Sequence, residues 1–303
     1  MNILITGACG FLGRNLVEHL AHSEHRLTLV DLQNTTVKGH LVHAVDAVHE
    51  HSRLNALMED KDVVIHAANK ARINPSWDHF GLYYDINITG SQNAFRTAQQ
   101  HGVKKFVYIS SSSVYGDISG PQKESDALLP TNPYGVSKLA AEHALRVQAQ
   151  QGDTELIIVR PFCMYGEFMD RGSEALVLSK FITAWAEGKA LTLDGGGRQT
   201  RDFIHATDAV KGLMAIVEHG KNGEVYNLGS GETVSIKELA DIVSSNQRIG
   251  AARVGNVRCT HADITKIKAL GFEPKVRVQD WLTNAMQDLK LKNPQQQGIT
   301  ECL

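Results

Sequence analysis

The sequence is poor in cysteine and has no long apolar run. Its four cysteines, in 303 residues, stand at positions 9, 163, 259 and 302, and none forms the closely spaced pair of a metal site. No apolar stretch approaches the roughly 20 residues that cross a bilayer, and no basic, then apolar, leader opens the chain. We therefore expect a cytoplasmic protein with free thiols and with neither a metal nor a membrane partner.

The net charge of the chain is also small. The formal charge is -2, and lysine and arginine are scattered, without the basic stripe that nucleic-acid binders carry. This distribution argues against a nucleic-acid partner. The length allows one large α/β domain or two smaller lobes, and it needs no disulfide to support a core.

Short apolar runs alternate with longer amphipathic ones through the first half of the chain. We expect strands over residues 3–6, 27–30, 63–65, 106–109 and 156–159, and helices over 11–21, 87–100 and 133–150. Continuous β-branched runs between helices are typical of parallel strands buried on both faces. The alternation predicts an α/β fold, a Rossmann-type doubly wound parallel sheet.

The second half is less regular and shows no linker. A helix is expected over 236–243, with Ser235 as its N-cap. Because no change in composition separates the halves, a second lobe would be interleaved with the first. We expect an NAD-binding domain over 1–165, a mainly substrate-binding lobe over 166–292 that partly returns to the first domain, and a flexible tail over 293–303.

Three glycines follow the first strand and lead into the first helix. Gly7, Gly10 and Gly13 would let the backbone approach a pyrophosphate, which the N–H groups at the helix start, around Phe11 and Leu12, would bind. Asp31 ends the second strand, at the distance expected for a ribose ligand. Its charge would repel a 2′-phosphate, so NAD is favoured over NADP. The alternative is a turn-forming glycine cluster beside a solvated aspartate.

Tyr134 and Lys138 are four residues apart and would share one face of a helix. A phenol is a weak base at neutral pH unless a cation favours its charged form, and Lys138 would supply that cation. Ser111, just past a strand end, could hydrogen-bond the same reacting oxygen. This trio is the candidate catalytic group; the alternative is a surface tyrosine–lysine pair.

Together these motifs resemble the NAD-dependent epimerase/dehydratase family, the extended short-chain dehydrogenases. The resemblance runs from Met1 to about Leu289. The matching segments are Gly7 to Gly13, His66 to Ala68, Asn87, Ser110 to Gly116, Tyr134 to Lys138, Arg160 to Phe162, Arg201 to Phe203 with Asp208, and Asn227 to Gly229.

The resemblance implies NAD as cofactor, a nucleotide sugar as substrate and roles for particular residues. Tyr134 would be the general base and acid, with Ser111 as its hydroxyl partner, and Lys138 would hold the nicotinamide ribose. The implied further cofactor-binding residues are Asp46 near the adenine, Ala67, Ala68 and Asn87. The implied substrate-binding residues are Ser112, Cys163, Arg201 and Arg253, the two arginines gripping a diphosphate.

Some departures from the family pattern reduce the number of reactions that the sequence can support. Cys163 stands where an asparagine usually contacts the diphosphate, and Glu167 replaces the usual proline after Gly166. Ser112 and Ser113 occupy the positions where the family's dehydratases and decarboxylases carry acidic residues, and neither serine can serve as a carboxylate acid or base. Epimerisation, at C4 of a UDP-hexose through a 4-keto intermediate, is therefore favoured.

Alternative functions keep the same fold. They are a nucleotide-sugar 4-ketoreductase or dehydratase and, more remotely, a non-catalytic dinucleotide-sensing protein, a class that usually lacks the tyrosine or the lysine. We also expect a homodimer, because family members commonly pair two helices per subunit. Here these are the helices near 93–98 and 139–145, whose small residues are Ala94, Ala98, Ala140, Ala141 and Ala144.

Overall fold

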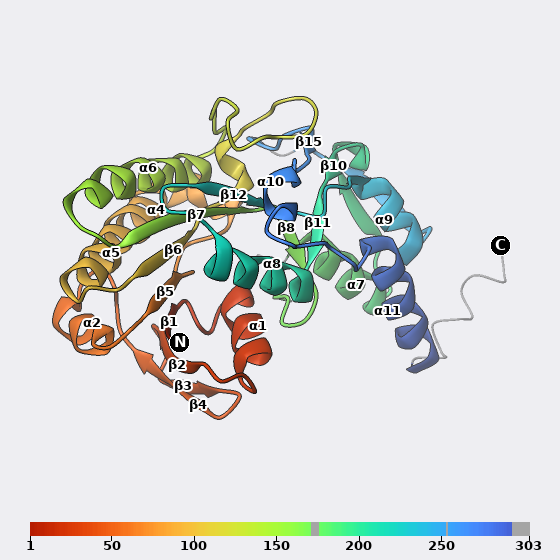
Figure 1. The fold of residues 1–303 in the computed structure, drawn as a ribbon. Helices are drawn as coiled ribbons and strands as arrows, with labels where there is room; N and C mark the ends of the chain where they lie inside the picture. Colours follow the sequence, from red (N-terminus) through yellow and green to blue (C-terminus); the bar gives the residue numbers. More distant parts are fainter. Residues whose placement is uncertain (171–175, 253, 293–303) are drawn as a thin grey trace.

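The computed structural model describes residues 1–170, 176–252 and 254–292. Its main feature is a sheet of eight strands (Figure 1). Their order is β12 (Val225–Leu228), β7 (Glu155–Pro161), β6 (Lys105–Ile109), β5 (Val63–His66), β1 (Asn2–Thr6), β2 (Arg26–Asp31), β4 (His40–Ala44) and β3 (Thr35–Val37). All neighbouring pairs are parallel except β3 and β4. The predicted fold class is confirmed.

The strand order reverses direction between β1 and β5. From β1 the chain adds β2 and β4 on one side, then returns to add β5, β6, β7 and β12 on the other. In open α/β sheets, ligands bind outside the carboxyl ends of the strands at such a reversal. The loops after Thr6 and His66 therefore mark the expected cofactor position.

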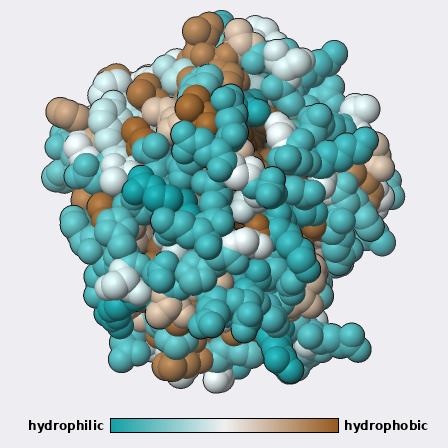
Figure 2. All heavy atoms as spheres, turned by 60° about the vertical axis from the view of Figure 1, so that its left-hand side comes forward, coloured by the Kyte–Doolittle hydropathy of each residue, from teal (hydrophilic) through white to brown (hydrophobic). Residues whose placement is uncertain are grey.

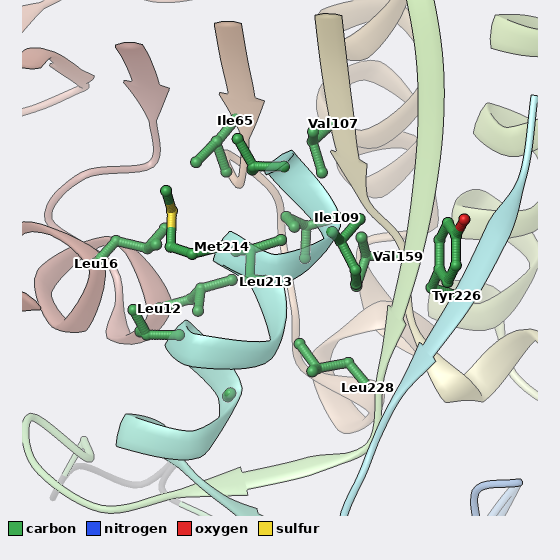
Figure 3. Close-up of a cluster of buried hydrophobic side chains, with 14 of the residues drawn as sticks. Leu12, Leu16, Ile65, Val107, Ile109, Val159, Leu213, Met214, Tyr226 and Leu228 are labelled. Carbon is green, nitrogen blue, oxygen red and sulfur yellow. The ribbon is translucent and has the colours of Figure 1, made fainter. Parts of the chain in front are cut away.

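Successive side chains of a strand point to opposite faces of the sheet, and here both sets are apolar. Helices therefore cover both faces. Ile3 and Ile5 point into one apolar cluster, while Leu4 between them points into the other. On the first face lie α1 (Phe11–Leu20) and α8 (Ala206–His219), which pack side by side, with the short α10 (Thr265–Lys268) nearby (Figure 1). Figure 3 shows Leu12, Leu213 and Met214 of these helices meeting the strands.

The second face is covered by α2 (His51–Met58), α5 (Ser91–Gln100) and α6 (Pro133–Gln148). Before α5 the chain forms α3 (Ile73–Asp78), α4 (Phe80–Tyr84) and a π-helical turn over Asp85–Gly90. The sequence pattern predicted one continuous helix over 87–100, but the wider turn replaces its start. The pattern found β1, α1, β2, β5, β6, α6 and β7 with small differences at their ends.

The remaining elements form a smaller lobe. It contains α7 (Val177–Ala186), α9 (Ile236–Val243) and α11 (Val278–Lys292) around a separate apolar cluster. Three small sheets complete it: β8 (Cys163–Tyr165) with β11 (Phe203–His205), β9 (Leu191–Asp194) with β14 (Gln247–Gly250), and β10 (Thr200–Arg201) between β13 (Val234–Ser235) and β15 (Cys259–Thr260). The predicted N-cap is present: the Ser235 hydroxyl accepts the Glu238 N–H at 3.1 Å.

The two parts are interleaved along the chain. Strand β12 and helix α8 come after residue 165, yet both belong to the large sheet and its covering layer. The expected tail over 293–303 lies outside the described residues. Within the described part of the chain, no helix is long and apolar enough to cross a membrane.

Candidate active site

The glycine loop packs against the end of β5. Gly7 has φ +72°, and a Cβ there would lie 2.7 Å from the Ala67 backbone carbon. A Cβ on Gly13 would lie 2.2 Å from the Gly7 carbonyl oxygen. Gly10 is the N-cap of α1 and donates its N–H to Gly7 O at 3.0 Å. The loop is a tight turn that only glycine permits, and it opens directly onto a helix N-terminus.

Two predicted cofactor residues brace this loop from either side. The Asp31 carboxylate accepts the Cys9 N–H at 2.9 Å and the Leu32 N–H at 2.8 Å. On the β5 side, the Ala68 N–H donates to the Thr6 hydroxyl at 3.2 Å. The loop, β2 and β5 are thus fixed together at the reversal of strand order.

The side chains of Asn87 and Asp46 make hydrogen bonds to other residues of the chain. The Asn87 side chain is fully buried, accepts the Lys70 N–H at 2.8 Å, and donates to Lys70 O at 3.1 Å and to the Ser137 hydroxyl at 2.8 Å. It fastens the loop after β5 to α6. The Asp46 carboxylate accepts the Val48 N–H at 2.8 Å and lies 2.9 Å from Nδ1 of His49. Direct contact of either residue with a cofactor stays a prediction.

The candidate catalytic residues meet at the carboxyl ends of β5 and β6. Asn132 caps α6 by accepting the Gly135 N–H at 2.9 Å, and Pro133 fills the first turn. This start places Tyr134 against Ser111 at the end of β6. Burial raises the pKa of Tyr134, while a hydrogen bond with the Ser111 side chain and the positive charge of Arg72 act to lower it.

Lys138 lies one turn further along α6 and is fully buried. Its ammonium nitrogen is 4.4 Å from the ring centre of Tyr108 and has no hydrogen-bond partner among the described residues. Burial lowers the pKa of Lys138 to about 7, and the nearby carboxylate of Glu142 opposes that shift. A buried amine with no acceptor among the described residues, beside the glycine loop, can donate hydrogen bonds to the hydroxyls of a ribose.

Arg72, which the sequence analysis did not single out, acts on Tyr134. Its carbonyl accepts the Tyr83 hydroxyl at 2.6 Å, and the Tyr83 ring packs edge-on against Tyr134 at 6.3 Å between centres. The Arg72 guanidinium reaches Asp170 at 4.0 Å. Arg72 is thus a second cation near the phenol, whose charge opposes the rise in the pKa of Tyr134, and the effect expected of Lys138 on the phenol stays a prediction. No motif marks Arg72, since α3 was not predicted.

Of the predicted substrate residues, Cys163 and Arg201 lie close together in the smaller lobe. Burial raises the pKa of the Cys163 thiol, and the charge of Arg201 opposes that shift. The Arg201 guanidinium donates to Thr200 O at 2.7 Å, to Asn256 Oδ1 at 2.5 Å and to Val257 O at 2.8 Å. It thus fixes the loop that follows Arg253, which lies outside the described residues. Ser112 is half-buried, beside Ser111.

This geometry fits a dinucleotide. The glycine cradle leaves no room for a Cβ at its closest approaches, a helix N-terminus faces it, and a buried amine without a partner lies past the neighbouring strand ends. The fold and the site together define a dinucleotide-dependent enzyme with a serine–tyrosine–lysine group.

Comparison with known proteins gives the family. The chain belongs to the NAD dependent epimerase/dehydratase family, whose sequence profile matches residues 3–229, and this confirms both the resemblance and the NAD cofactor. It is 31% identical to an uncharacterized UDP-glucose epimerase, YtcB, of Bacillus subtilis, over 94% of this chain and 96% of that protein. It is 28% identical to a dTDP-glucose 4,6-dehydratase of Streptomyces griseus, over 93% of this chain and 92% of that one.

Solved structures agree with these relatives. The crystal structure of UDP-glucuronic acid 4-epimerase from Bacillus cereus, in complex with UDP-glucuronic acid and NAD, superposes with a TM-score of 0.86. It shares 30% identity, and the match covers 95% of this chain and 100% of that one.

Proposed function

We propose that this protein is an NAD-dependent nucleotide-sugar epimerase that inverts C4 of a UDP-hexose. The observation that carries the proposal is the meeting of Ser111, Tyr134 and the unpartnered Lys138 amine beside the glycine cradle. A relative named as a UDP-glucose epimerase and a solved structure named as a UDP-glucuronic acid 4-epimerase support the choice of reaction.

The side chains divide the work as follows. The Tyr134 phenolate takes the proton of the sugar's 4-hydroxyl, the resulting phenol later returns it, and Ser111 hydrogen-bonds the same sugar oxygen. Lys138 holds the nicotinamide ribose through its buried amine. When bound, NAD would be held by the glycine loop and Lys138 and would supply the hydride acceptor and donor that inversion at C4 requires. Arg72 favours the charged form of Tyr134 while the proton is away.

The same positions argue against the related eliminations. Ser112 and Ser113 form the first turn after the catalytic serine, where the dehydratases and decarboxylases of the family carry acidic residues. A hydroxyl at its ordinary pKa cannot replace a carboxylic acid that protonates a leaving group. A 4-ketoreductase remains the alternative, and it would consume reduced cofactor in proportion to product.

One experiment separates these reactions. Purified protein is incubated with UDP-glucose, UDP-glucuronic acid or dTDP-glucose without added cofactor, and the sugars are followed by proton NMR. Catalytic formation of the C4 epimer supports the proposal. Loss of the C6 hydroxyl would identify a dehydratase. Oxidation of the 4-hydroxyl to a ketone, only with added NAD or NADP and in proportion to it, would identify a reductase running in reverse, and no turnover with bound NAD would point to a sensing protein.

Substrate choice is assigned to the smaller lobe, within residues 166–292, together with Cys163. Cys163 and Arg201 are the described residues proposed to contact the diphosphate, and the role of Arg253, which lies outside the described residues, stays a prediction from the resemblance. A thiol offers a weaker hydrogen bond than the amide usual in the family, a difference of about 0.5–1.5 kcal/mol. Cys163→Asn and Cys163→Ala, compared across UDP-, GDP- and dTDP-sugars, test this role; unchanged affinities would leave Cys163 as packing.

We further propose a homodimer through the outer face of α5 and α6. Ala94, Ala98 and Ala141 are fully buried within the subunit, so they cannot contribute to a partner contact as expected from the sequence. The outer face of α6 instead presents an apolar row made of Val136, Ala140, Ala144 and Val147. Figure 2 shows this side of the molecule as mainly hydrophilic, with its hydrophobic residues gathered chiefly in the upper half.

The cytoplasm is the proposed compartment. Cys9, Cys163 and Cys259 are free thiols, which suits a reducing environment.

A further inference from the structure

Glu142 is a buried carboxylate that the proposed mechanism does not use. It lies on α6, is 1% exposed, and is held on both oxygens. Ser110 donates to Oε1 at 2.5 Å, Arg160 Nε donates to Oε1 at 3.0 Å, and Arg160 Nη2 donates to Oε2 at 2.6 Å. Arg160 thus pairs with the carboxylate in a bidentate way, and Ser110 adds a third hydrogen bond.

The position of Glu142 relates it to the candidate catalytic residues. Tyr134, Lys138 and Glu142 are spaced at i, i+4 and i+8, so they share one face of α6. The face lies against β6, where the Tyr108 ring sits under the Lys138 amine. Among the described residues the buried Lys138 amine has no hydrogen-bond acceptor, and the Glu142 carboxylate lies one helical turn away.

Burial acts on the other titratable groups around Lys138 in favour of their neutral forms. From β5, His66 is buried, and burial and the Lys138 charge lower its pKa to about 3. From β6, burial raises the pKa of Tyr108 above its ordinary value, and burial likewise raises that of Tyr134 on α6. Glu142 is the described group whose charge opposes the effect of burial on Lys138. Arg160, from β7, forms a hydrogen-bonded ion pair with Glu142.

We propose that Glu142 is a positioning residue that keeps Lys138 in its charged form, and that Arg160 and Ser110 hold the Glu142 carboxylate in place. The purpose of this arrangement rests on the proposed function, because a charged Lys138 is what binds the nicotinamide ribose. The electrostatic relation between the two side chains does not depend on the reaction catalysed.

The direct test is the titration of Lys138 in the cofactor-free protein. Protein labelled with 13C at the lysine ε-carbons is titrated by NMR, and the Lys138 signal is assigned by its loss in Lys138→Met. In Glu142→Gln the midpoint should fall by about one pH unit or more, since a nearby opposite charge shifts a buried group by that amount. In Glu142→Gln alone, the unpaired charge of Arg160 can destabilise the fold. The double variant Glu142→Gln with Arg160→Met removes both charges and is used if the single variant does not fold.

Tyr115→Phe is the matched control. The Tyr115 hydroxyl accepts from Arg160 Nη1 at 3.0 Å and donates to Asn227 at 2.7 Å, so its loss disturbs the same buried network but keeps the Glu142 charge. Its Lys138 midpoint should equal that of the wild type. The proposal is overturned if the midpoint is unchanged in the Glu142 variants, or if Tyr115→Phe moves it as far.

A second readout is the pH dependence of NAD binding. Affinity in the Glu142 variants should weaken toward alkaline pH earlier than in the wild type, by the same shift as the NMR midpoint. If the Lys138 midpoint shifts as stated while no sugar nucleotide is epimerised, the proposed function fails and the inference about Glu142 stands.

Discussion

Tyr134 and Lys138 are both driven by burial toward their neutral forms, yet the chemistry uses the charge of each. Burial raises the pKa of Tyr134 and lowers that of Lys138 to about 7. Polar neighbours oppose both shifts: Ser111 and Arg72 at the phenol, and Glu142 at the amine. We therefore expect Arg72 and Glu142 to tune the reactivity of the pair without contacting the sugar, whereas Ser111 would contact it.

Removing either member of the pair should abolish turnover. In Tyr134→Phe the base is lost, and the rate should fall by about 10²- to 10⁴-fold while NAD still binds. In Lys138→Met both the rate and NAD affinity should fall, because the ribose loses its buried partner. Steady-state assays and NAD titration measure these effects. Activity within about tenfold of the wild type in Tyr134→Phe would refute the role given to it.

His66 should make stability depend on acid pH. Its ring nitrogens lie 2.8 Å from the Thr6 hydroxyl and 3.1 Å from that of Ser91, and burial and the Lys138 charge lower its pKa to about 3. The unfolded chain therefore binds one more proton than the folded chain between about pH 6.5 and pH 3, so this contribution to stability falls as the pH falls through that range.

The expected size is up to about 1.4 kcal/mol per pH unit for one proton. Urea unfolding at pH 7.5 and pH 5 should show a smaller loss in His66→Gln than in the wild type. His143→Gln, on the exposed side of α6, provides the control and should lose as much as the wild type. Equal losses in all three proteins would contradict the assignment.

At the scale of elements, the glycine loop is the most constrained turn of the candidate site. A Cβ on Gly13 would lie 2.2 Å from the Gly7 carbonyl oxygen, whereas one on Gly10 would lie 3.2 Å from the same atom. Because the obstructing atom is backbone, it cannot rotate away as a side chain would. The two positions therefore differ sharply in tolerance, although the motif treats them alike.

Gly13→Ala should consequently destabilise the protein by more than the roughly 1–3 kcal/mol typical of overpacking, and it should abolish NAD binding. Gly10→Ala should cost less and retain measurable NAD affinity. Thermal unfolding with and without NAD distinguishes them, since a bound cofactor raises the midpoint. Similar losses in both variants would show that the loop relaxes more freely than its geometry indicates.

The sequence predicted elements best where one signal is strong and local. Buried parallel strands and the capped helix over 236–243 were found, because their periodicity and caps lie within a few residues. The segment 35–44, which forms β3 and β4, was missed because its strands are short and polar. Helix α8 was also missed, although its packing on α1 closes one face of the sheet.

The candidate site was predictable for the motif residues and not for their neighbours. Tyr134, Lys138 and Ser111 have fixed spacing or strand ends to mark them. Arg72, at the start of α3, acts on Tyr134 across a tertiary contact that no spacing reveals. Glu142 has a helical spacing from Lys138, but its pairing with Arg160 of β7 is likewise a tertiary contact. The roles of Ala94, Ala98 and Ala141 were misjudged for the same reason, because a helical stripe of small residues can face the core or a partner.

For the whole molecule, the expected assembly depends on an exposed apolar row. Val147, on α6, is 65% exposed, so Val147→Glu should leave the subunit folded and convert the dimer to a monomer, because a desolvated charge is costly in an interface. Light scattering at micromolar concentration measures the change. Leu291→Glu, at an equally exposed position on α11, should leave the dimer intact, and a monomeric wild type would refute the expectation.

The interleaving of the two parts also bears on how the chain folds during synthesis. A nascent chain that has reached residue 165 holds seven of the eight strands, but β7 still lacks β12 beside it and the face of the sheet that α8 covers is bare. Unpaired strand edges and uncovered apolar faces associate with other chains. The ribosome must deliver about 60 further residues before β12 can dock. Slow translation across 166–228 should therefore favour aggregation, and a product ending near residue 165 should need a chaperone to stay in solution.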